Sequence, residues 1–355
     1  MTERTLIMGV LNVTPDSFSD GGEYFDTGRA IDRGIQLAAE GADIVDVGGE
    51  STRPGAERIT PEEEQFRVMP VVAALTASGI PVSIDTMNAS TAILAVESGA
   101  SYINDVSGGL ADFFMPRAAA TSGVTFIASH WRGHSADMDQ KAIYKDAPTD
   151  IRRELSTRAA ALLEAGVEPH RLVLDPGLGF AKTVEHNWQM LGRMEELMAL
   201  GYPILIGASR KRFLTTLLTE DSSDEERDNA SVAVSVLAAN AGAWAVRVHD
   251  VARTAAALRA MIPTRAGAAR IEETETERRA RQVERELADL EFDLDAELAI
   301  AAELRREEAT RQEIIGALVR QAEQQAREAA AASAMQVSTT DNPLAEPRIE
   351  TSERD

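Results

Sequence analysis

The run Leu6–Val13, LIMGVLNV, is apolar along its whole length except at Asn12. A strand that is buried on both faces has this continuous apolar pattern, whereas a strand with one face in water alternates. Seven more such runs follow along the chain: Asp43–Val47, Val82–Asp85, Tyr102–Val106, Thr125–Ser129, Leu172–Leu174, Ile204–Ile206 and Trp244–Val248. Helix-like segments separate them, and several of these segments end at a glycine. Examples are Ala30–Glu40, Pro61–Ala77, Ala89–Glu97 and Ile151–Ala165.

Eight strand–helix units within about 260 residues match a (β/α)8 TIM barrel, a fold that typically takes about 250 residues. A doubly wound open sheet is the alternative, because the spacing of the runs does not prove that the sheet closes. The uncharged stretch Asn229–Val246 is rich in Ala, Ser and Asn, so we expect a buried helix that leads into a strand and no membrane span.

The composition limits the partners and the compartment. The 355 residues carry a formal net charge of −22, which argues against nucleic acid as a partner because a phosphate backbone needs a basic face. The absence of cysteine excludes disulfides and thiolate metal sites, and it suits a reducing cytoplasm. The first residues are polar and the apolar run after them is too short for a signal peptide, so we predict a cytoplasmic protein.

Charge and proline content divide the chain. Residues 271–355 hold 22 acidic and 11 basic residues, and all of these bases are arginine. We predict a barrel over residues 1–264, a linker at 265–270, a charged amphipathic helical extension at 271–333 and a disordered tail at 334–355. The extension is interpreted as a solubilising appendage, with a helix that docks an unknown partner as the alternative.

A polar residue stands at or near the carboxyl end of every predicted strand, where barrel enzymes carry their catalytic groups. In chain order these residues are Asn12, Asp46, Asp85, Asn104, His130, Asp175, Ser209 with Lys211, and Arg247 with His249. Any one of them could be a helix cap or a turn residue. Eight strand ends that converge on one mouth indicate an enzyme site.

The residue types at these ends narrow the chemistry. With no cysteine and no Gly-x-Ser-x-Gly elbow, acyl transfer through a nucleophile is disfavoured. Donors suited to phosphate or diphosphate follow the last two strands: Ser209, Arg210, Lys211, Arg247 and His249. Asn12 suits a Mg²⁺ ion whose other ligands are substrate phosphates. Asp85, Asn104 and Asp175 suit a heterocycle edge that is rich in N–H donors.

Two long segments resemble the signature motifs of the dihydropteroate synthases. The first is Gly9–Gly22, GVLNVTPDSFSDGG, and the second is Asp46–Gly55, DVGGESTRPG. Five shorter matches follow in the same order: Ser83–Thr86, Ile103–Val106, Leu174–Phe180, Ser209–Lys211 and Arg247–His249. The resemblance extends over about residues 5–262, and the length of the first two motifs makes chance agreement implausible.

The resemblance implies a homodimeric TIM-barrel enzyme of folate biosynthesis that is a target of sulfonamides. Enzymes of this family use Mg²⁺ and join 4-aminobenzoate to 6-hydroxymethyl-7,8-dihydropterin diphosphate, which gives 7,8-dihydropteroate and diphosphate. In the family the diphosphate departs first, and the amine then attacks the cationic pterin methylene. Fixed cations and buried carboxylates would stabilise the two charges that develop.

The resemblance also implies a role for each matching residue. Those implied to be catalytic are Asp85, Lys211, Arg247 and His249, and the metal would contact Asn12. The pterin diphosphate would bind Thr52, Asp85, Asn104, Asp175, Lys211, Arg247, Val248 and His249. The 4-aminobenzoate pocket would consist of Thr52, Arg53, Pro54, Phe180 and Ser209. Residues 14–24 and 51–59 form Gly-, Ser- and Pro-rich loops that we expect to close over the site.

Some positions carry other expectations. Ser129 stands before His130 where the family often has Met, and the acidic extension lies outside the family's usual length. We expect Asp46 to be a structural carboxylate bonded to nearby backbone, Arg210 to be able to point away from the mouth, and Met8 to be a packing residue.

Two alternative functions stay open at this point. A pterin-binding methyltransferase is disfavoured by Thr52-Arg53-Pro54 and by the pair Arg247 and His249. A catalytically silent scaffold is disfavoured because the site residues are intact.

Overall fold

The computed structural model describes residues 4–14, 23–50, 58–134, 138–219 and 222–261, together with residues 303 and 306. By its internal contacts the chain divides into two units, Met1–Arg270 and Ile271–Asp355. Nearly all of the second unit and the whole predicted linker lie outside the described residues, so the predicted domain boundaries stay predictions. Within the described ranges, no helix is long and apolar enough to cross a membrane.

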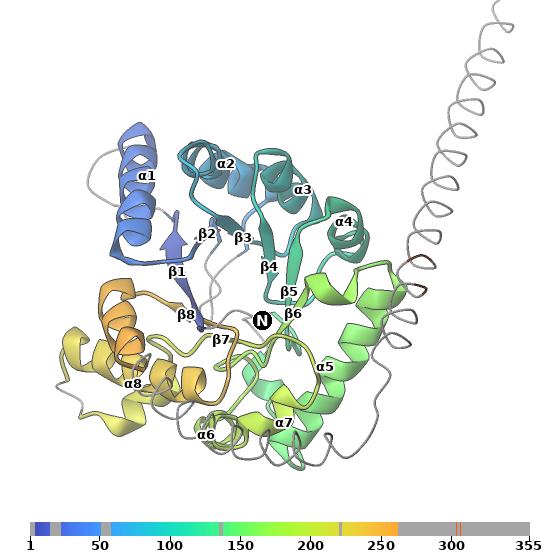
Figure 1. Cartoon of the computed structure of the whole chain (residues 1–355), viewed down its shortest axis with the longest axis vertical. Coiled ribbons are helices and arrows are strands. Elements are labelled where there is room, and N and C mark those ends of the chain that lie inside the picture. Colours follow the sequence, from blue (N-terminus) through green and yellow to red (C-terminus); the bar gives the residue numbers. More distant parts are fainter. Residues whose placement is uncertain are drawn as a thin grey trace, which may run out of the picture. The chain divides into compact units, whose positions relative to one another are not determined.

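Eight parallel strands form one sheet in the order β6-β5-β4-β3-β2-β1-β8-β7. Their bounds are β1 (Leu6–Asn12), β2 (Ile44–Gly48), β3 (Val82–Asp85), β4 (Tyr102–Asp105), β5 (Thr125–Ser129), β6 (Leu172–Asp175), β7 (Leu205–Ile206) and β8 (Ala245–Val248). The two ends of the sheet meet where Leu174 pairs with Ile204 and its N–H donates to the Pro203 carbonyl at 2.9 Å. The sheet therefore closes into the predicted barrel, and the open-sheet alternative is wrong (Figure 1).

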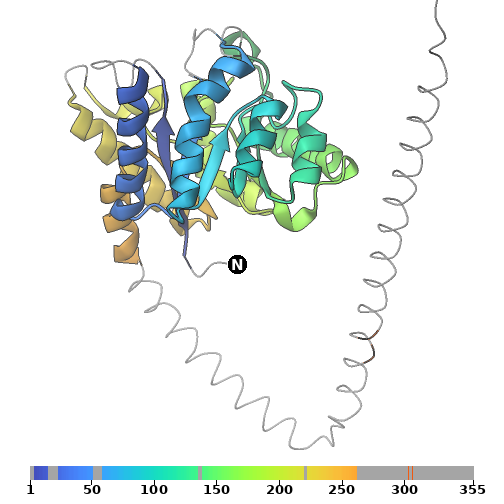
Figure 2. The ribbon, with the colours of Figure 1, turned by 90° about the horizontal axis from the view of Figure 1, so that it is seen from above.

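Helices surround the strands on the outside of this ring (Figures 1 and 2). Their bounds are α1 (Glu23–Glu40), α2 (Pro61–Ala77), α3 (Ala89–Glu97), α4 (Met115–Ser122), α5 (Ala147–Glu164), α6 (Val184–Gly192), α7 (Met194–Met198) and α8 (Asp224–Asn240), and residues 251–261 are also helical. Short 3₁₀ turns occupy Met138–Lys141, Pro169–Arg171 and Arg212–Leu217. The helix expected from Ala30 begins earlier, at Glu23, so the predicted loop 14–24 is shorter than expected.

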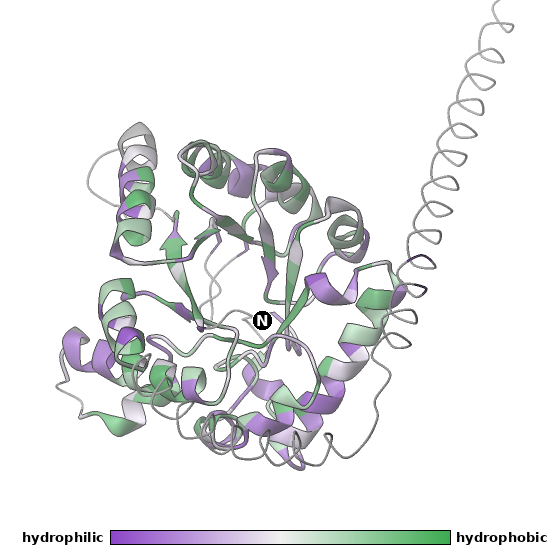
Figure 3. Ribbon diagram, in the orientation of Figure 1, coloured by the Kyte–Doolittle hydropathy of each residue, from purple (hydrophilic) through white to green (hydrophobic). Residues whose placement is uncertain are grey.

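Two apolar clusters pack the barrel. The larger lies between strands and helices and includes Val45, Ile84 and Phe126. The smaller consists of Met8, Ile44, Ile127, Val173, Leu205 and Ala245, one inward-facing side chain from each of six strands. Inward-facing residues recur at every second position along a strand. The next inward residue is polar on several strands, such as Asp46 after Ile44, Asp175 after Val173 and Arg247 after Ala245. Figure 3 shows this change from apolar to polar colour along several strands.

Candidate active site

Strand register places several of the predicted site residues at one level of the barrel. Asn12 on β1 pairs with Gly48 on β2, Gly48 pairs with Asp85 on β3, and Asp85 pairs with Asn104 on β4. The carboxyl ends of these four strands therefore form one rim. Asp85 and Asn104 are direct neighbours, and Gly48 separates Asp85 from Asn12 at the same level, so the predicted strand ends do converge on one rim.

Arg247 on β8 lies inside the barrel and bonds two carboxylates. Its Nε donates to Asp46 Oδ2 at 2.6 Å, and its Nη2 donates to Asp85 Oδ2 at 2.7 Å. Asn104 also donates to Asp46 Oδ2, at 3.0 Å. Asp46 is fully buried, and the prediction that it bonds nearby backbone is wrong, because its partners are side chains. Its second oxygen, Oδ1, has no hydrogen-bond partner.

Burial sets the charge state of this group. It raises the pKa of Asp85 to about 7, although the Arg247 guanidinium works against the rise. Burial works to lower the pKa of Arg247, but Asp46 and Asp85 hold it above its ordinary value. Arg247 is thus a permanent cation in a low-dielectric interior, where a charge acts more strongly than in water.

Asp175 and Lys211 approach Arg247 around Gly207, the residue after β7. A Cβ atom at Gly207 would lie 3.9 Å from both Asp175 Oδ2 and Lys211 Nζ, and 3.7 Å from Arg247 Cβ. Glycine at this position leaves room between the three side chains. Burial lowers the pKa of Lys211 to about 8 and raises that of Asp175, and each charge opposes the shift of the other.

The β6–α6 loop, residues 176–183, borders this group. Lys211 Nζ donates to the carbonyl of Leu178 and lies 4.6 Å from the centre of the Phe180 ring. Phe180 and Lys211, predicted to serve different substrates, are therefore in contact. The Asp175 carboxylate accepts from the Gly177 N–H at 2.7 Å, which joins the end of β6 to the same loop.

Ser209 and His249 form a second pair at the mouth. Ser209 Oγ lies 3.0 Å from His249 Nδ1 and accepts from the His249 backbone N–H at 3.2 Å. Arg210, in contrast, points to α8, where it bonds Asp228 at 2.8 and 2.9 Å. The side chain thus points away from the mouth, as the sequence analysis allowed, and the expectation that it is an anion donor at the mouth is wrong. The Val248 side chain packs in the outer core, so the prediction for Val248 concerns its backbone.

Three predicted residues, Thr52, Arg53 and Pro54, lie outside the described residues, as do most of the two loops expected to close over the site. Asn12 is described and half-buried at the end of β1. Among the described residues no group of three or more His, Asp or Glu side chains could hold a metal ion. The described chain thus offers a metal the amide oxygen of Asn12 and no acidic cage.

The sequence analysis missed a buried polar network next to the site. His130 was noted at the end of β5 without a role, and Lys182 was not singled out at all. Their side chains are in contact, with Glu154 of α5 beyond His130. The sequence did offer a reason to consider Lys182, because it lies only two residues after Phe180, the last residue of a matched motif.

The fold and the site together define a class of protein. A closed parallel barrel whose mouth gathers Arg247, Lys211 and His249 beside Asp85, Asn104 and Asp175 is a barrel enzyme built for an anionic substrate with an N–H-rich ring. A family model described as pterin binding enzyme matches residues 8–249. That match covers β1 from Met8 onward and the other seven strands in full.

Named relatives agree with the family model. A dihydropteroate synthase of Mycobacterium leprae is 50% identical over 258 residues, which are 71% of this chain and 91% of the relative. One of Bacillus subtilis is 42% identical over 254 residues, 71% of this chain and 86% of the relative. The chain belongs to the pterin-binding enzyme family and, within it, to the dihydropteroate synthases.

Solved structures support the same assignment. A Xanthomonas albilineans dihydropteroate synthase with 4-aminobenzoic acid matches with a TM-score of 0.70 and 42% identity, covering 74% of this chain and 94% of the other. The enzyme from the same organism in complex with 7,8-dihydropteroate gives a TM-score of 0.68 and 38% identity, over 75% and 95% of the two chains.

Proposed function

We propose that this chain condenses 6-hydroxymethyl-7,8-dihydropterin diphosphate with 4-aminobenzoate, giving 7,8-dihydropteroate and diphosphate in folate biosynthesis. The observation that carries the proposal is the cluster around Gly207, where Asp175, Lys211 and Arg247 approach one another while Arg247 also bonds Asp85. Such a cluster supplies acceptors for a pterin ring and cations for a diphosphate within one buried group.

The pterin ring is proposed to bind at the inner part of the cluster. Asp85, Asn104 and Asp175 carry acceptors for ring N–H and amino groups, and Lys211 carries donors for the ring carbonyl. The buried Asp46 Oδ1, which has no partner, adds an acceptor at the level below. A buried acceptor without a partner costs free energy, so a ligand that donates to it gains affinity.

The diphosphate is proposed to bind at the rim, between the guanidinium of Arg247, the backbone of Val248 and the His249 ring. Arg247 spends two of its five N–H groups on Asp46 and Asp85, and a guanidinium presents all five in one plane. Asn12 ends the adjacent strand β1, which pairs with β8. Cations fixed at this end stabilise the negative charge that develops on the leaving group.

Mg²⁺ is proposed as the cofactor, held by the Asn12 amide oxygen together with diphosphate oxygens. The donor set fits an ion that keeps water or substrate ligands, because Mg²⁺ is commonly bound through one or two protein oxygens and substrate phosphates. When bound, it would neutralise charge on the diphosphate.

The aminobenzoate is proposed to contact Phe180 of the β6–α6 loop, Ser209, and residues Thr52, Arg53 and Pro54. Phe180 supplies an aromatic face for the substrate ring. The Lys211 cation lies beside Phe180, where it can make a cation–π contact with that ring. The amine would then face the pterin methylene that Lys211 helps to position.

The reaction would proceed through separated charges. The bond between the methylene carbon and the diphosphate oxygen breaks, and its electron pair leaves with the diphosphate. The cationic methylene is stabilised by the nearby carboxylates Asp85 and Asp175, which act strongly because they are buried. The amine nitrogen then forms the new C–N bond and releases one proton to solvent. No covalent bond to the enzyme forms.

The test is a transfer assay with purified protein, Mg²⁺, the pterin diphosphate and 4-aminobenzoate. We expect release of diphosphate and formation of 7,8-dihydropteroate in equal amounts, both blocked by a sulfonamide. Omission of 4-aminobenzoate separates transfer from simple hydrolysis. If saturating substrates gave no dihydropteroate above background, the proposed function would be wrong.

We further propose that the enzyme works as a homodimer in the cytoplasm. The cysteine-free composition supports a reducing compartment. Sedimentation analysis tests the dimer, and a single species of about 38 kDa, the mass of one chain, would contradict it.

A further inference from the structure

Lys182 is buried in the β6–α6 loop, and burial lowers the pKa of its amino group to about 7, although the Asp175 carboxylate works against the fall. Its Nζ donates to the carbonyls of Gly177 and Phe180 at 3.0 Å each and lies 3.0 Å from Nδ1 of His130. An ammonium group has three N–H donors and no acceptor. Each donor of the protonated Lys182 therefore has one partner inside the protein, and two of the three partners are carbonyls of the loop.

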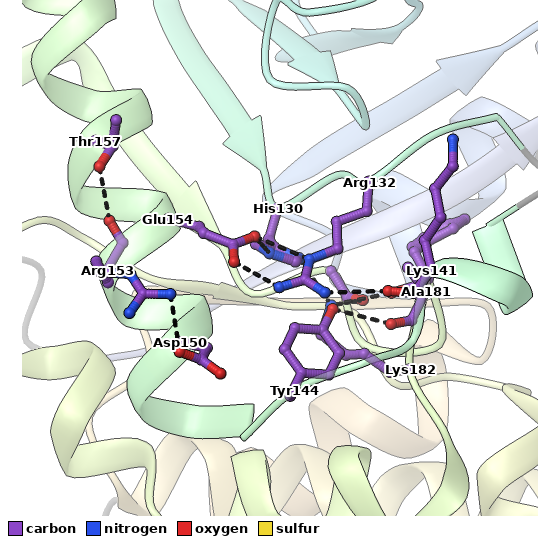
Figure 4. A network of polar contacts seen from close by, with 12 residues as sticks. His130, Arg132, Lys141, Tyr144, Asp150, Arg153, Glu154, Thr157, Ala181 and Lys182 are labelled. Carbon is purple, nitrogen blue, oxygen red and sulfur yellow. Dashed lines mark hydrogen bonds and ion pairs between the residues drawn. The ribbon is translucent and has the colours of Figure 1, made fainter. Parts of the chain in front are cut away.

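This contact fixes the His130 ring. When Lys182 is protonated it can only donate, so His130 Nδ1 accepts, and the ring proton lies on Nε2, which donates to Glu154 Oε2 at 2.9 Å. Burial lowers the pKa of His130 to about 4, so the ring is neutral at pH 7. Arg132 donates to both oxygens of Glu154 and completes a chain of four charged or polar groups (Figure 4).

The loop that this chain holds contains strained backbone. Ala181 has a φ of 48°, a conformation that costs free energy for any residue with a Cβ atom. Tyr144 Oη donates to the Ala181 carbonyl at 2.9 Å, and Lys182 bonds the carbonyl just before it. Such a conformation persists only where its surroundings enforce it, and these two side chains do so.

A second lysine bonds the same loop. Lys211, from the active site, donates to the Leu178 carbonyl, between the two carbonyls that Lys182 bonds. The chain has only four lysines against 32 arginines, and these two are among the four. A compact ammonium directs three donors to acceptors around one point, which a planar guanidinium does not. Lysine at both positions therefore suits hydrogen bonding to the carbonyls of this loop.

We propose that Lys182 is a positioning residue for the transfer reaction. It is anchored through His130 and Glu154 and holds the β6–α6 loop in place. In that position Phe180 can contact 4-aminobenzoate, and the Leu178 carbonyl can accept a hydrogen bond from Lys211. The inference rests on the proposed function, because Phe180 belongs to the proposed aminobenzoate pocket. Lys182 itself touches neither substrate in this account, since its donors are all used within the protein.

The first test is Lys182→Met in the full chain, which keeps the length of the side chain and removes its donors. We expect the KM for 4-aminobenzoate to rise on the order of 10- to 100-fold, because small misplacements of a binding wall have effects of this size. The KM for the pterin diphosphate should change less, because Lys211 and Asp175 contact this loop but Asp85 and Asn104, on β3 and β4, do not. Lys145→Met, at an exposed lysine, is the matched control and should leave both constants unchanged.

A second variant covers the case in which Lys182→Met does not fold. Glu154→Gln weakens the far end of the chain at a partly exposed position, and it should raise the same KM by a smaller factor. Nitrogen NMR of the His130 ring gives a readout that a general loss of stability does not move. We expect Nε2 protonated and Nδ1 unprotonated in the native enzyme, and a changed Nδ1 signal in Lys182→Met.

The outcomes separate the two proposals. A wild-type chain without transfer activity would contradict the proposed function, whatever the variants do. An active wild type with folded Lys182→Met and Glu154→Gln variants whose aminobenzoate KM stays within about twofold would overturn the role of Lys182. A lower kcat with both KM values unchanged would also overturn it. That result would show a lost interaction with the transition state and not a misplaced aminobenzoate pocket.

Discussion

Arg247 and Asp46 are 201 positions apart in the sequence, and their side chains bond at 2.6 Å inside the barrel. Asp46 is fully buried and Arg247 is partly so, and Asn104 bonds the same carboxylate oxygen. A buried ion pair is stabilising only when its hydrogen bonds are complete, and removal of one partner leaves an uncompensated charge. The pair therefore holds Arg247 in place at the centre of the proposed site.

Asp46→Asn should destabilise the protein by about 3 kcal/mol, because it leaves Arg247 with one carboxylate in place of two. Urea unfolding at pH 7 measures this as a lower midpoint with an unchanged slope. The exposed pair Arg212 and Asp139 provides the control, and Asp139→Asn should leave the midpoint where it is. Equal midpoints for Asp46→Asn and wild type would contradict a structural role for Asp46.

Lys211→Ala should abolish tight pterin binding while the fold survives. The variant loses a charged hydrogen-bond donor at the proposed ring carbonyl, a contact worth roughly 1.5–3 kcal/mol or about 10- to 150-fold in affinity. Calorimetric titration with the pterin diphosphate measures the change, with circular dichroism to confirm folding. Lys145→Ala is the control. Wild-type affinity in Lys211→Ala would mean that the role of Lys211 has been misplaced.

Much of the fold followed from the sequence, because a parallel strand buried on both faces leaves a continuous apolar run. The strands at residues 82–85 and 125–129 have the predicted bounds, and others differ by a residue or two. The start of α1 was wrong by several residues, since the segment before Ala30 contains the polar and aromatic residues typical of a loop. Closure of the sheet was predicted from the number of strand–helix units. Only the pairing of Leu174 on β6 with Ile204, next to β7, could confirm it.

The site was predicted less completely, for a physical reason. Position at a strand end places a residue on the rim, but it does not say where the side chain points or which partner it takes. Arg210 and Lys211 are neighbours in the sequence, and one bonds α8 while the other reaches the loop beside the site. The contact between His130 and Lys182 joins residues 52 apart, and no local sequence pattern encodes a contact over that separation.

Gly177→Ala should be strongly destabilising. Gly177 has a φ of 64°, and a Cβ there would lie 2.5 Å from the carbonyl oxygen of His130, which is too close for backbone atoms to relieve easily. We expect a loss of several kcal/mol in the free energy of unfolding, on the order of other strained core substitutions. Gly192→Ala is the matched control, because that glycine ends α6 with open space around it and should be neutral or mildly stabilising.

His130 should make stability depend on pH. Folding lowers its pKa from 6.5 to about 4, mainly through burial, so the folded state resists protonation. The stability that this contributes is present above pH 6.5 and is lost as the pH falls from 6.5 to about 4. The loss amounts to about 3 kcal/mol, because a tenfold change in proton affinity corresponds to about 1.4 kcal/mol.

The measurement is the free energy of unfolding of wild type and His130→Gln between pH 7 and pH 4. The difference between the two should shrink as the pH falls, whereas His170→Gln, at an exposed histidine, should follow wild type throughout. A constant difference between wild type and His130→Gln would show that His130 is not buried in its neutral form.

A chain that ends at Gly267 should keep its transfer activity. The family match stops at residue 249, and the helical residues 251–261 that follow it place Val251 and Ala255 in the barrel core. All the described side chains of the proposed site precede that point, so the shortened chain retains the residues that bind and react. We expect kcat/KM for 4-aminobenzoate within about threefold of the full chain, since each 1.4 kcal/mol of lost transition-state stabilisation would appear as a tenfold fall. A large fall in turnover by a well-folded shortened chain would make the acidic residues 271–355 part of the working enzyme, and would contradict their interpretation as an appendage.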